Sequence, residues 1–150
     1  MIDFPNEECK WTWLAGLMDA DSSIDFYKKP RKSGLIHWNN QLVIRQTNFD
    51  LVKQAQTVFG HGNTYQRQRG KNRPIIYGIR LCKRDKIKYV LQRILPYLIK
   101  KKRQAELLLE AIDILQKHKF NTTFDDRLNK IFLEIRSLHD GKYHASYHTH

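Results

Sequence analysis

The sequence predicts an α+β domain in which one antiparallel sheet carries helices on a single face. Segments with apolar residues at alternate positions are interspersed with segments of helical periodicity, and each of two closely spaced strand pairs is followed by a helix. The length of 150 residues suits one domain. We therefore expect a single domain over residues 1–140 and a flexible, polar, His-rich tail over 141–150.

The first half of the chain predicts a helix, a hairpin and a second helix. Apolar and polar residues alternate in both strands, so that Ile24, Phe26, Leu42 and Ile44 face inward and Val43 faces outward. Asn48 is a suitable N-cap and Gly60 a suitable helix end. In chain order the expected elements are helix Asn6–Ala20, strand Ser23–Lys29, a turn at Pro30–Gly34, strand His37–Gln46 and the helix between Asn48 and Gly60.

The second half repeats this order and adds two helices. Apolar residues recur three and four positions apart in each predicted helix, which gives each one an apolar stripe for the core. The expected elements are strands Tyr65–Arg69 and Pro74–Leu81 around a turn at Gly70–Arg73, a helix Arg84–Leu95 ended by Pro96, and helices Gln104–Leu115 and Asp126–Leu138. The resulting order is αββαββα followed by extra C-terminal helices.

The predicted sheet has one face that no helix covers, and its side chains are mostly polar. A polar open face is common on antiparallel sheets without any ligand. Here the arginine and amide content matches the donors and acceptors that base edges in a major groove require, which favours a binding face. The residues expected on this face are Asp25, Tyr27, Lys29, Asn39, Gln41, Arg45, Arg67, Arg69, Ile76 and Arg80.

The charge of the chain indicates a polyanionic partner. Lys and Arg number 27 against 15 Asp and Glu, a net charge of +12. Residues 61–103 contain 14 Lys and Arg against one acid, Asp85, so this stretch alone carries +13, more than the surplus of the whole chain. Segregation of this kind favours nucleic acid over a merely solvated surface. No apolar run approaches the roughly 18 residues of a membrane span, so we expect no membrane partner. Two cysteines indicate reduced thiols in an intracellular protein.

The segment Leu14–Ser22 holds the strongest candidates for catalytic residues. Its small residues, Ala15, Gly16 and Ala20, allow a second helix to approach closely. Two carboxylates then stand at the helix C-terminus, where negative charge is unfavourable. A bound divalent cation would offset that cost; the alternative is that Asp19 or Asp21 only caps a helix or turn.

This segment is similar to the signature of the LAGLIDADG homing endonucleases, with identity at seven of nine positions. The departures are Met18, where the family usually has Ile, and Ser22, where its Gly would ease the turn that leaves the helix. The element order over residues 8–116 is similar to the family's αββαββα domain, whose sheet forms a DNA-binding saddle. The resemblance implies a homodimer, with the motif helices packed across a twofold axis through Trp11, Leu14, Ala15, Gly16 and Met18.

The same resemblance implies a set of site residues. Asp21 would be the metal ligand, together with the carbonyl group of Ala20, for Mg²⁺ or for Mn²⁺ in its place; Asp19 would be structural. Asn48 matches a polar residue that orders the nucleophilic water, usually Gln in the family. Lys101 matches a basic residue near the scissile phosphate, and Lys100 and Lys102 remain alternatives.

The implied reaction is hydrolysis of one phosphodiester in each strand of a long, pseudo-palindromic DNA site, leaving 3′ overhangs. Arginines of the open face would read guanine, Gln41 and Asn39 adenine, and Tyr27 or Ile76 a thymine methyl, while Lys29 and Arg31 would hold phosphates. The alternatives are an intron RNA-splicing maturase and a catalytically inactive DNA-binding protein of the same fold. We expect an intron-encoded protein in a prokaryotic cytoplasm or an organelle that carries its gene.

Overall fold

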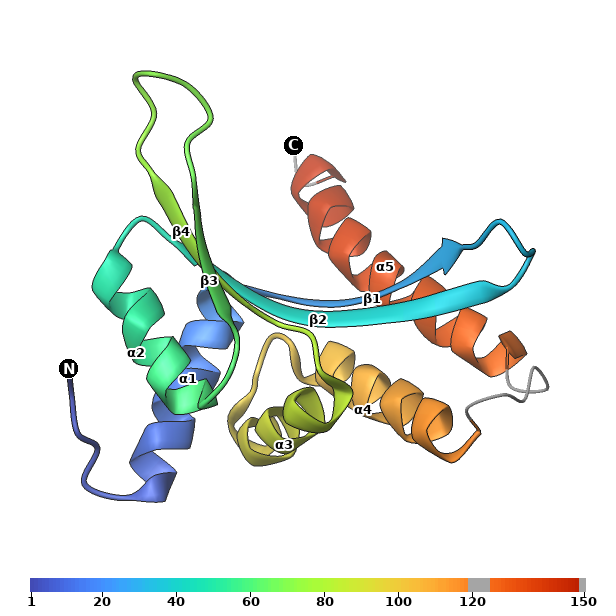
Figure 1. Cartoon of the computed structure of the whole chain (residues 1–150), viewed down its shortest axis with the longest axis horizontal. Helices are drawn as coiled ribbons and strands as arrows, with labels where there is room; N and C mark the ends of the chain where they lie inside the picture. The colour runs from blue at the N-terminus through green and yellow to red at the C-terminus, as the bar shows by residue number, and fades with distance from the viewer. Residues whose placement is uncertain (119–124, 149–150) are drawn as a thin grey trace.

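The computed structural model describes residues 1–118 and 125–148, and its element order follows the expected one (Figure 1). The elements are α1 (Glu7–Asp21), β1 (Ser22–Pro30), β2 (Ile36–Gln46), α2 (Phe49–Phe59), β3 (Asn63–Arg67), β4 (Ile76–Leu81), α3 (Arg84–Ile94), a 3₁₀ turn η1 (Leu95–Tyr97), α4 (Lys102–Lys117) and α5 (Asp125–His148). The predicted α+β class with one antiparallel sheet is confirmed; α1 to α4 lie on one side of the sheet, and the C-terminal end of α5 rises past β1 on the other (Figure 1).

The four strands form one antiparallel sheet in the order β1-β2-β4-β3. The central strands β2 and β4 pair only over Leu42–Gln46 and Tyr77–Leu81. Beyond this short join the β1–β2 hairpin and the β3–β4 hairpin separate into two arms, and α1 to α4 lie together on the other side of the sheet (Figure 1). The open face is therefore a curved surface between two projecting hairpins.

Side-chain hydrogen bonds take over where the central ladder ends. Beyond Leu42, Asn40 Nδ2 donates to the carbonyl of Cys82 at 2.8 Å, and Arg84 Nε donates to Asn40 Oδ1 at 3.0 Å. Arg84 Nη2 also donates to the carbonyl of Trp38 at 2.7 Å. The first turn of α3 thus braces the base of the β1–β2 arm, and burial lowers the pKa of the Arg84 guanidinium.

The last helix, α5, packs against the core-facing side of the β1–β2 arm. Leu128, Ile131 and Ile135 of α5 are buried in the core, and Trp38 stacks on Phe26 at 5.0 Å between ring centroids. Lys28 donates to Asn129 at 2.9 Å. Lys28 of the arm is therefore tied to α5.

The β3–β4 hairpin has a longer loop than the sequence predicted. The strands are Asn63–Arg67 and Ile76–Leu81, so residues 68–75 form the connection and Arg69 lies outside its predicted strand. Pro74 has no backbone N–H for a ladder, and Gly70 has a φ of 148°. Both residues favour a wide loop.

The C-terminal region departs from the expected boundary, because the backbone of α5 is helical through His148. The flexibility expected of residues 141–150 stays a prediction, and residues 149–150 lie outside the described ones. No helix among the described residues is long and apolar enough to cross a membrane.

Candidate active site and nucleic-acid interface

The last residue of α1, Asp21, lies at the junction between the motif helix and the sheet. Its side chain is exposed, and its Oδ2 accepts a hydrogen bond of 2.5 Å from Nε2 of Gln46, the last residue of β2. The strand register explains this contact: β1 begins at Ser22 opposite Ile44, so the residue before β1 meets the end of β2. An amide donor thus orients one oxygen of the carboxylate.

The environment of Asp21 suits a hard divalent cation. The carbonyl groups in the last turn of a helix lack intrahelical donors, and the last turn of α1 contains no basic side chain. Ala20 is exposed beside Asp21, so its carbonyl group and the carboxylate are oxygen ligands of the kind that Mg²⁺ prefers. Across residues 1–118 and 125–148, no three or more His, Cys, Asp or Glu side chains form a metal-binding group.

The other motif carboxylate, Asp19, has a structural role, as the resemblance implied. Its oxygens accept backbone N–H groups from Ile99 at 2.8 Å, Lys100 at 3.1 Å and Lys101 at 3.0 Å. Hydrogen bonds to a carboxylate are stronger than neutral ones. Asp19 therefore fixes the turn before α4 against the end of α1.

That turn carries Lys101, one of the three candidate lysines, to the end of the motif helix. Lys101 is only 8% exposed, whereas Lys100 and Lys102 are exposed. Its Nζ donates to the carbonyl of Met18 at 3.0 Å and to that of Ser22. A cation at a helix C-terminus is favourable, so Lys101 offsets the carboxylates that α1 presents there.

Asn48 caps α2, and its predicted role in ordering the nucleophilic water stays a prediction. Its Oδ1 accepts the N–H of Leu51 at 3.1 Å, which makes it the N-cap of α2. The N-cap prediction is therefore confirmed, and the polar side chain beside Asp21 is Gln46. Gln46 was missed because it is the last residue of the predicted strand His37–Gln46, and only the strand register shows that its side chain meets Asp21.

Three arginines gather around Asp21. A shallow pocket of about 330 Å³ is lined by Asp21, Arg45, Gln46, Thr47, Arg67, Arg69 and Ile76. The strands β2 and β4, and β3 with the loop after it, thus bring four predicted base-reading residues next to Asp21. These are Arg45, Arg67, Arg69 and Ile76. Their positive charge suits a phosphate-rich ligand.

The strand register confirms the predicted open face. Asp25 lies opposite Gln41, Tyr27 opposite Asn39, and Lys29 opposite His37; Val43 lies opposite Arg80, and Arg67 opposite Ile76. Val43 is on this face as predicted, yet it is fully buried and lies outside the main core. Neighbouring polar side chains cover it.

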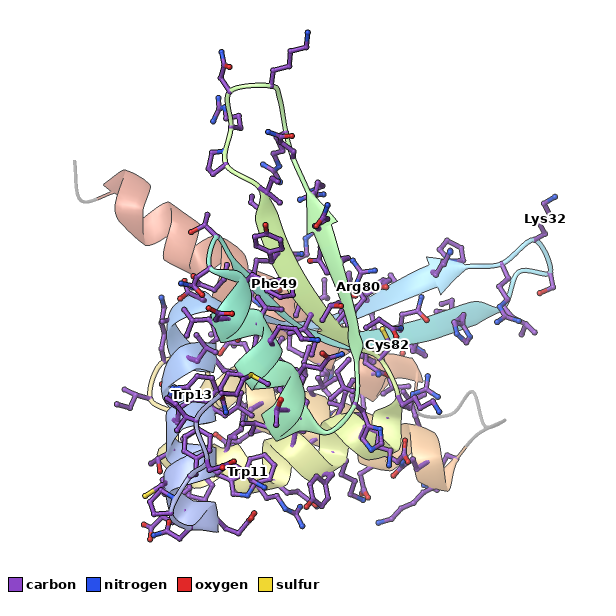
Figure 2. The ribbon with its side chains drawn as sticks, turned by 60° about the vertical axis from the view of Figure 1, so that its left-hand side comes forward. Trp11, Trp13, Lys32, Phe49, Arg80 and Cys82 are labelled. Atoms are coloured by element: carbon purple, nitrogen blue, oxygen red, sulfur yellow. The ribbon has the colours of Figure 1, made fainter. Side chains whose placement is uncertain are left out.

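One residue of this face, Tyr65, was absent from the predicted set. It lies opposite Gly78, and a Cβ at Gly78 would come within 2.3 Å of the Tyr65 ring. The ring therefore lies flat across the neighbouring strand, with the Arg80 guanidinium 5.2 Å from its centroid. Figure 2 shows Arg80 between the two arms. The period-two pattern of β3 was the signal for Tyr65.

At the far end of the β1–β2 arm, Arg31 Nη2 donates to Nδ1 of His37 at 3.2 Å. Burial, followed by the charges of Arg31, Arg84 and Lys29, lowers the pKa of His37. The neutral ring is the form that accepts this hydrogen bond. Lys32 marks the tip of the arm in Figure 2.

The predicted dimer interface on α1 needs correction. Trp11, Leu14, Ala15 and Met18 are buried in this chain's own core, so they present no surface to a partner. Of the predicted set only Gly16 is exposed, on a stripe with Thr12 and Ala20. The helix is apolar on nearly every side, so periodicity alone did not show which side the sheet and α3 would cover.

Comparison with known proteins places this geometry in context. DNA endonuclease I-CvuI from Chlorella vulgaris is 26% identical over 111 residues, 71% of this chain and 66%, just under two thirds, of that protein. The crystal structure of I-CvuI with its target has a TM-score of 0.76 at 24% identity, covering 87% of this chain and 82% of that one. The archaeal intron-encoded homing endonuclease I-Vdi141I, complexed with DNA, has a TM-score of 0.76 at 18% identity, covering 89% and 86%.

The two solved structures share the fold of this chain. The family model described as LAGLIDADG endonuclease matches residues 14–110, a stretch that includes Asp21, Gln46 and Lys101. This match spans more than half of the chain. The chain therefore belongs to the LAGLIDADG endonuclease family.

Proposed function

We propose that this protein is a site-specific endonuclease that acts as a homodimer on a long, pseudo-palindromic DNA duplex. The observation that carries the proposal is the placement of Asp21, with its partner Gln46, in one pocket with Arg45, Arg67 and Arg69, where α1 meets the sheet. A carboxylate that only capped a helix would not need an amide donor and three cations around it.

The residues divide the work of hydrolysis. Asp21 and the Ala20 carbonyl group would hold a divalent cation, Mg²⁺ or Mn²⁺, which supplies an activated water and stabilises charge on the leaving oxygen. Gln46 would orient the carboxylate and help to position the water. Lys101 contributes positive charge at the end of α1. Cleavage of one phosphodiester in each strand, with 3′ overhangs, is the outcome proposed for two such sites.

A second subunit fits the exposed stripe of α1. Thr12, Gly16 and Ala20 leave room for a second helix backbone, and half-buried Trp13 and Leu17 flank them. Among the described residues, Asp21 is the exposed carboxylate of the motif, so the second subunit would supply the other. The arms of two subunits would then follow a duplex along its length. Such a protein acts where its host DNA lies, in a prokaryotic cytoplasm or an organelle, and an intron-encoded origin is part of the proposal.

The test is cleavage of a randomised, roughly palindromic duplex library with Mg²⁺. A recovered site should be cut by the unaltered chain, and Asp21→Asn should lower its cleavage at least about a thousandfold, because several kcal/mol of charge stabilisation are lost. Affinity for the site should stay nearly unchanged. Full cutting by Asp21→Asn would overturn the mechanism; tight binding to an intron RNA without DNA cleavage would favour the maturase.

A further inference from the structure

Besides Asp21, the open face carries a second carboxylate, Asp25, among its predicted base-reading side chains. Asp25 lies at the centre of β1, on the face that carries Arg45, Arg80 and Lys29. Negative charge opposes the approach of phosphates. A compensating role for this side chain is therefore needed.

The two oxygens of Asp25 are both engaged within the sheet. Oδ2 accepts a hydrogen bond of 2.8 Å from Nε2 of Gln41, its direct cross-strand neighbour. Oδ1 accepts a hydrogen bond from the hydroxyl of Ser23, two residues earlier on the same face. Asp25 is also only partly exposed, and fully buried Val43 lies next along β2 on this face. The carboxylate is thus held in one orientation.

This arrangement fixes the side-chain amide of Gln41. An ionised carboxylate only accepts hydrogen bonds, so it selects the NH₂ end of the amide and excludes the oxygen end. Gln41 then presents its carbonyl oxygen and one remaining N–H away from Asp25. That donor and acceptor pair matches N7 and the N6 amino group of adenine, and the reversed amide does not.

We infer that Asp25 is a positioning residue that sets the base preference of Gln41 and makes no base contact of its own. The inference rests on the proposed function, since it concerns recognition of the same DNA. It replaces the expectation that Asp25 itself binds DNA. The negative charge lowers overall affinity, and the fixed amide increases discrimination at one base pair.

The experiment is a binding selection from a randomised duplex library, analysed position by position, with the full chain and three variants. Gln41→Ala and Asp25→Asn should each reduce discrimination about tenfold at the same base pair, the scale of one bidentate contact. The double variant should lose no more than Gln41→Ala alone. Asp25→Asn should also bind non-specific duplex severalfold more tightly, because the like-charge repulsion is removed.

Asn39 provides the matched control, because it lies on the same strand and face opposite Tyr27 rather than a carboxylate. Asn39→Ala should change a different base pair, and its effect should add to that of Asp25→Asn. Three outcomes would overturn the inference. The losses of discrimination from Asp25→Asn and Gln41→Ala could add in the double variant, they could fall at different base pairs, or discrimination could decline uniformly at all positions. A selected duplex whose profile Asp25→Asn leaves unchanged would overturn it alone; no selected duplex for the unaltered chain would overturn the proposed function as well.

Discussion

The amide of Gln46 donates to the carboxylate of Asp21 across 2.5 Å, which joins the end of the second strand to the end of the motif helix. Asp21 is the final residue of α1 and Gln46 the final residue of β2. The contact couples the geometry of the proposed cleavage site to the open face of the sheet. Two polar residues near this point, Gln46 and Asn48, now have separable roles.

Replacement of these two residues should give opposite results. Gln46→Ala should slow cleavage about 10- to 100-fold, the usual cost of removing a residue that orients a metal ligand. Asn48→Ala should leave the cleavage rate at 25 °C unchanged and lower the free energy of unfolding by about 1 kcal/mol, because the α2 cap is lost. Single-turnover cleavage and denaturant titration measure both. Slow cleavage by Asn48→Ala alone would support its predicted catalytic role.

The exposed stripe of α1 predicts a variant that separates folding from assembly. Nothing lies within 4 Å of a Cβ at Gly16, so Gly16→Leu should fold, with a gain of up to about 1 kcal/mol in helix propensity. The leucine should prevent close packing of two helices and leave a monomer that does not cut. Sedimentation and denaturant titration measure the two effects.

Met18 is the matched control on the buried side of the same helix, with no exposed surface. Met18→Ala should lower the free energy of unfolding by about 2–5 kcal/mol and leave the association of folded chains intact. A dimer of undiminished affinity in Gly16→Leu would contradict the proposed interface.

Gly78 should tolerate a side chain only if Tyr65 changes with it. Gly78→Ala must displace the Tyr65 ring, because its Cβ would lie 2.3 Å from that ring. The stack on Arg80 is then lost, at a cost of about 0.5–1 kcal/mol, and DNA affinity should fall two- to fivefold, roughly in step. In a Tyr65→Ala background the same substitution should have no further effect on affinity. Equal losses in both backgrounds would show that the ring is not responsible.

The attachment of α5 to α4 should weaken in acid. Hydrogen bonds from Arg127 and Arg103 hold the pKa of Glu110 and of Glu134, respectively, below their usual value of 4.5. A carboxyl whose pKa is lower in the folded state stabilises that state above its unfolded pKa, and this contribution is lost as the pH falls through the folded value.

The free energy of unfolding should therefore decrease as the pH falls from about 5 through the region below 4.5. The double variant Glu110→Gln with Glu134→Gln should give a flatter profile over the same range, and salt should reduce the difference because both ion pairs are partly exposed. Parallel profiles for the two proteins would exclude these pairs as the cause.

Local patterns in the sequence predicted much of this molecule. Alternation in β1 and β2 placed the polar side chains of the open face on one side, Asn48 and Gly60 marked the ends of α2, and the motif singled out Asp21. Each of these signals depends on neighbours a few residues apart, which the sequence states directly. The wide β3–β4 loop was missed because its turn residues fit a short turn equally well.

The sequence by itself determined the fold class, the open polar face, the positive charge and the motif carboxylate. Only the tertiary structure decided that Gln46 rather than Asn48 meets Asp21, that Lys101 is the lysine at the end of α1, and that Gly16 rather than Met18 faces outward. These outcomes depend on strand register and on which side of an almost wholly apolar helix the sheet covers. Both are set by packing between distant segments, which no local periodicity encodes.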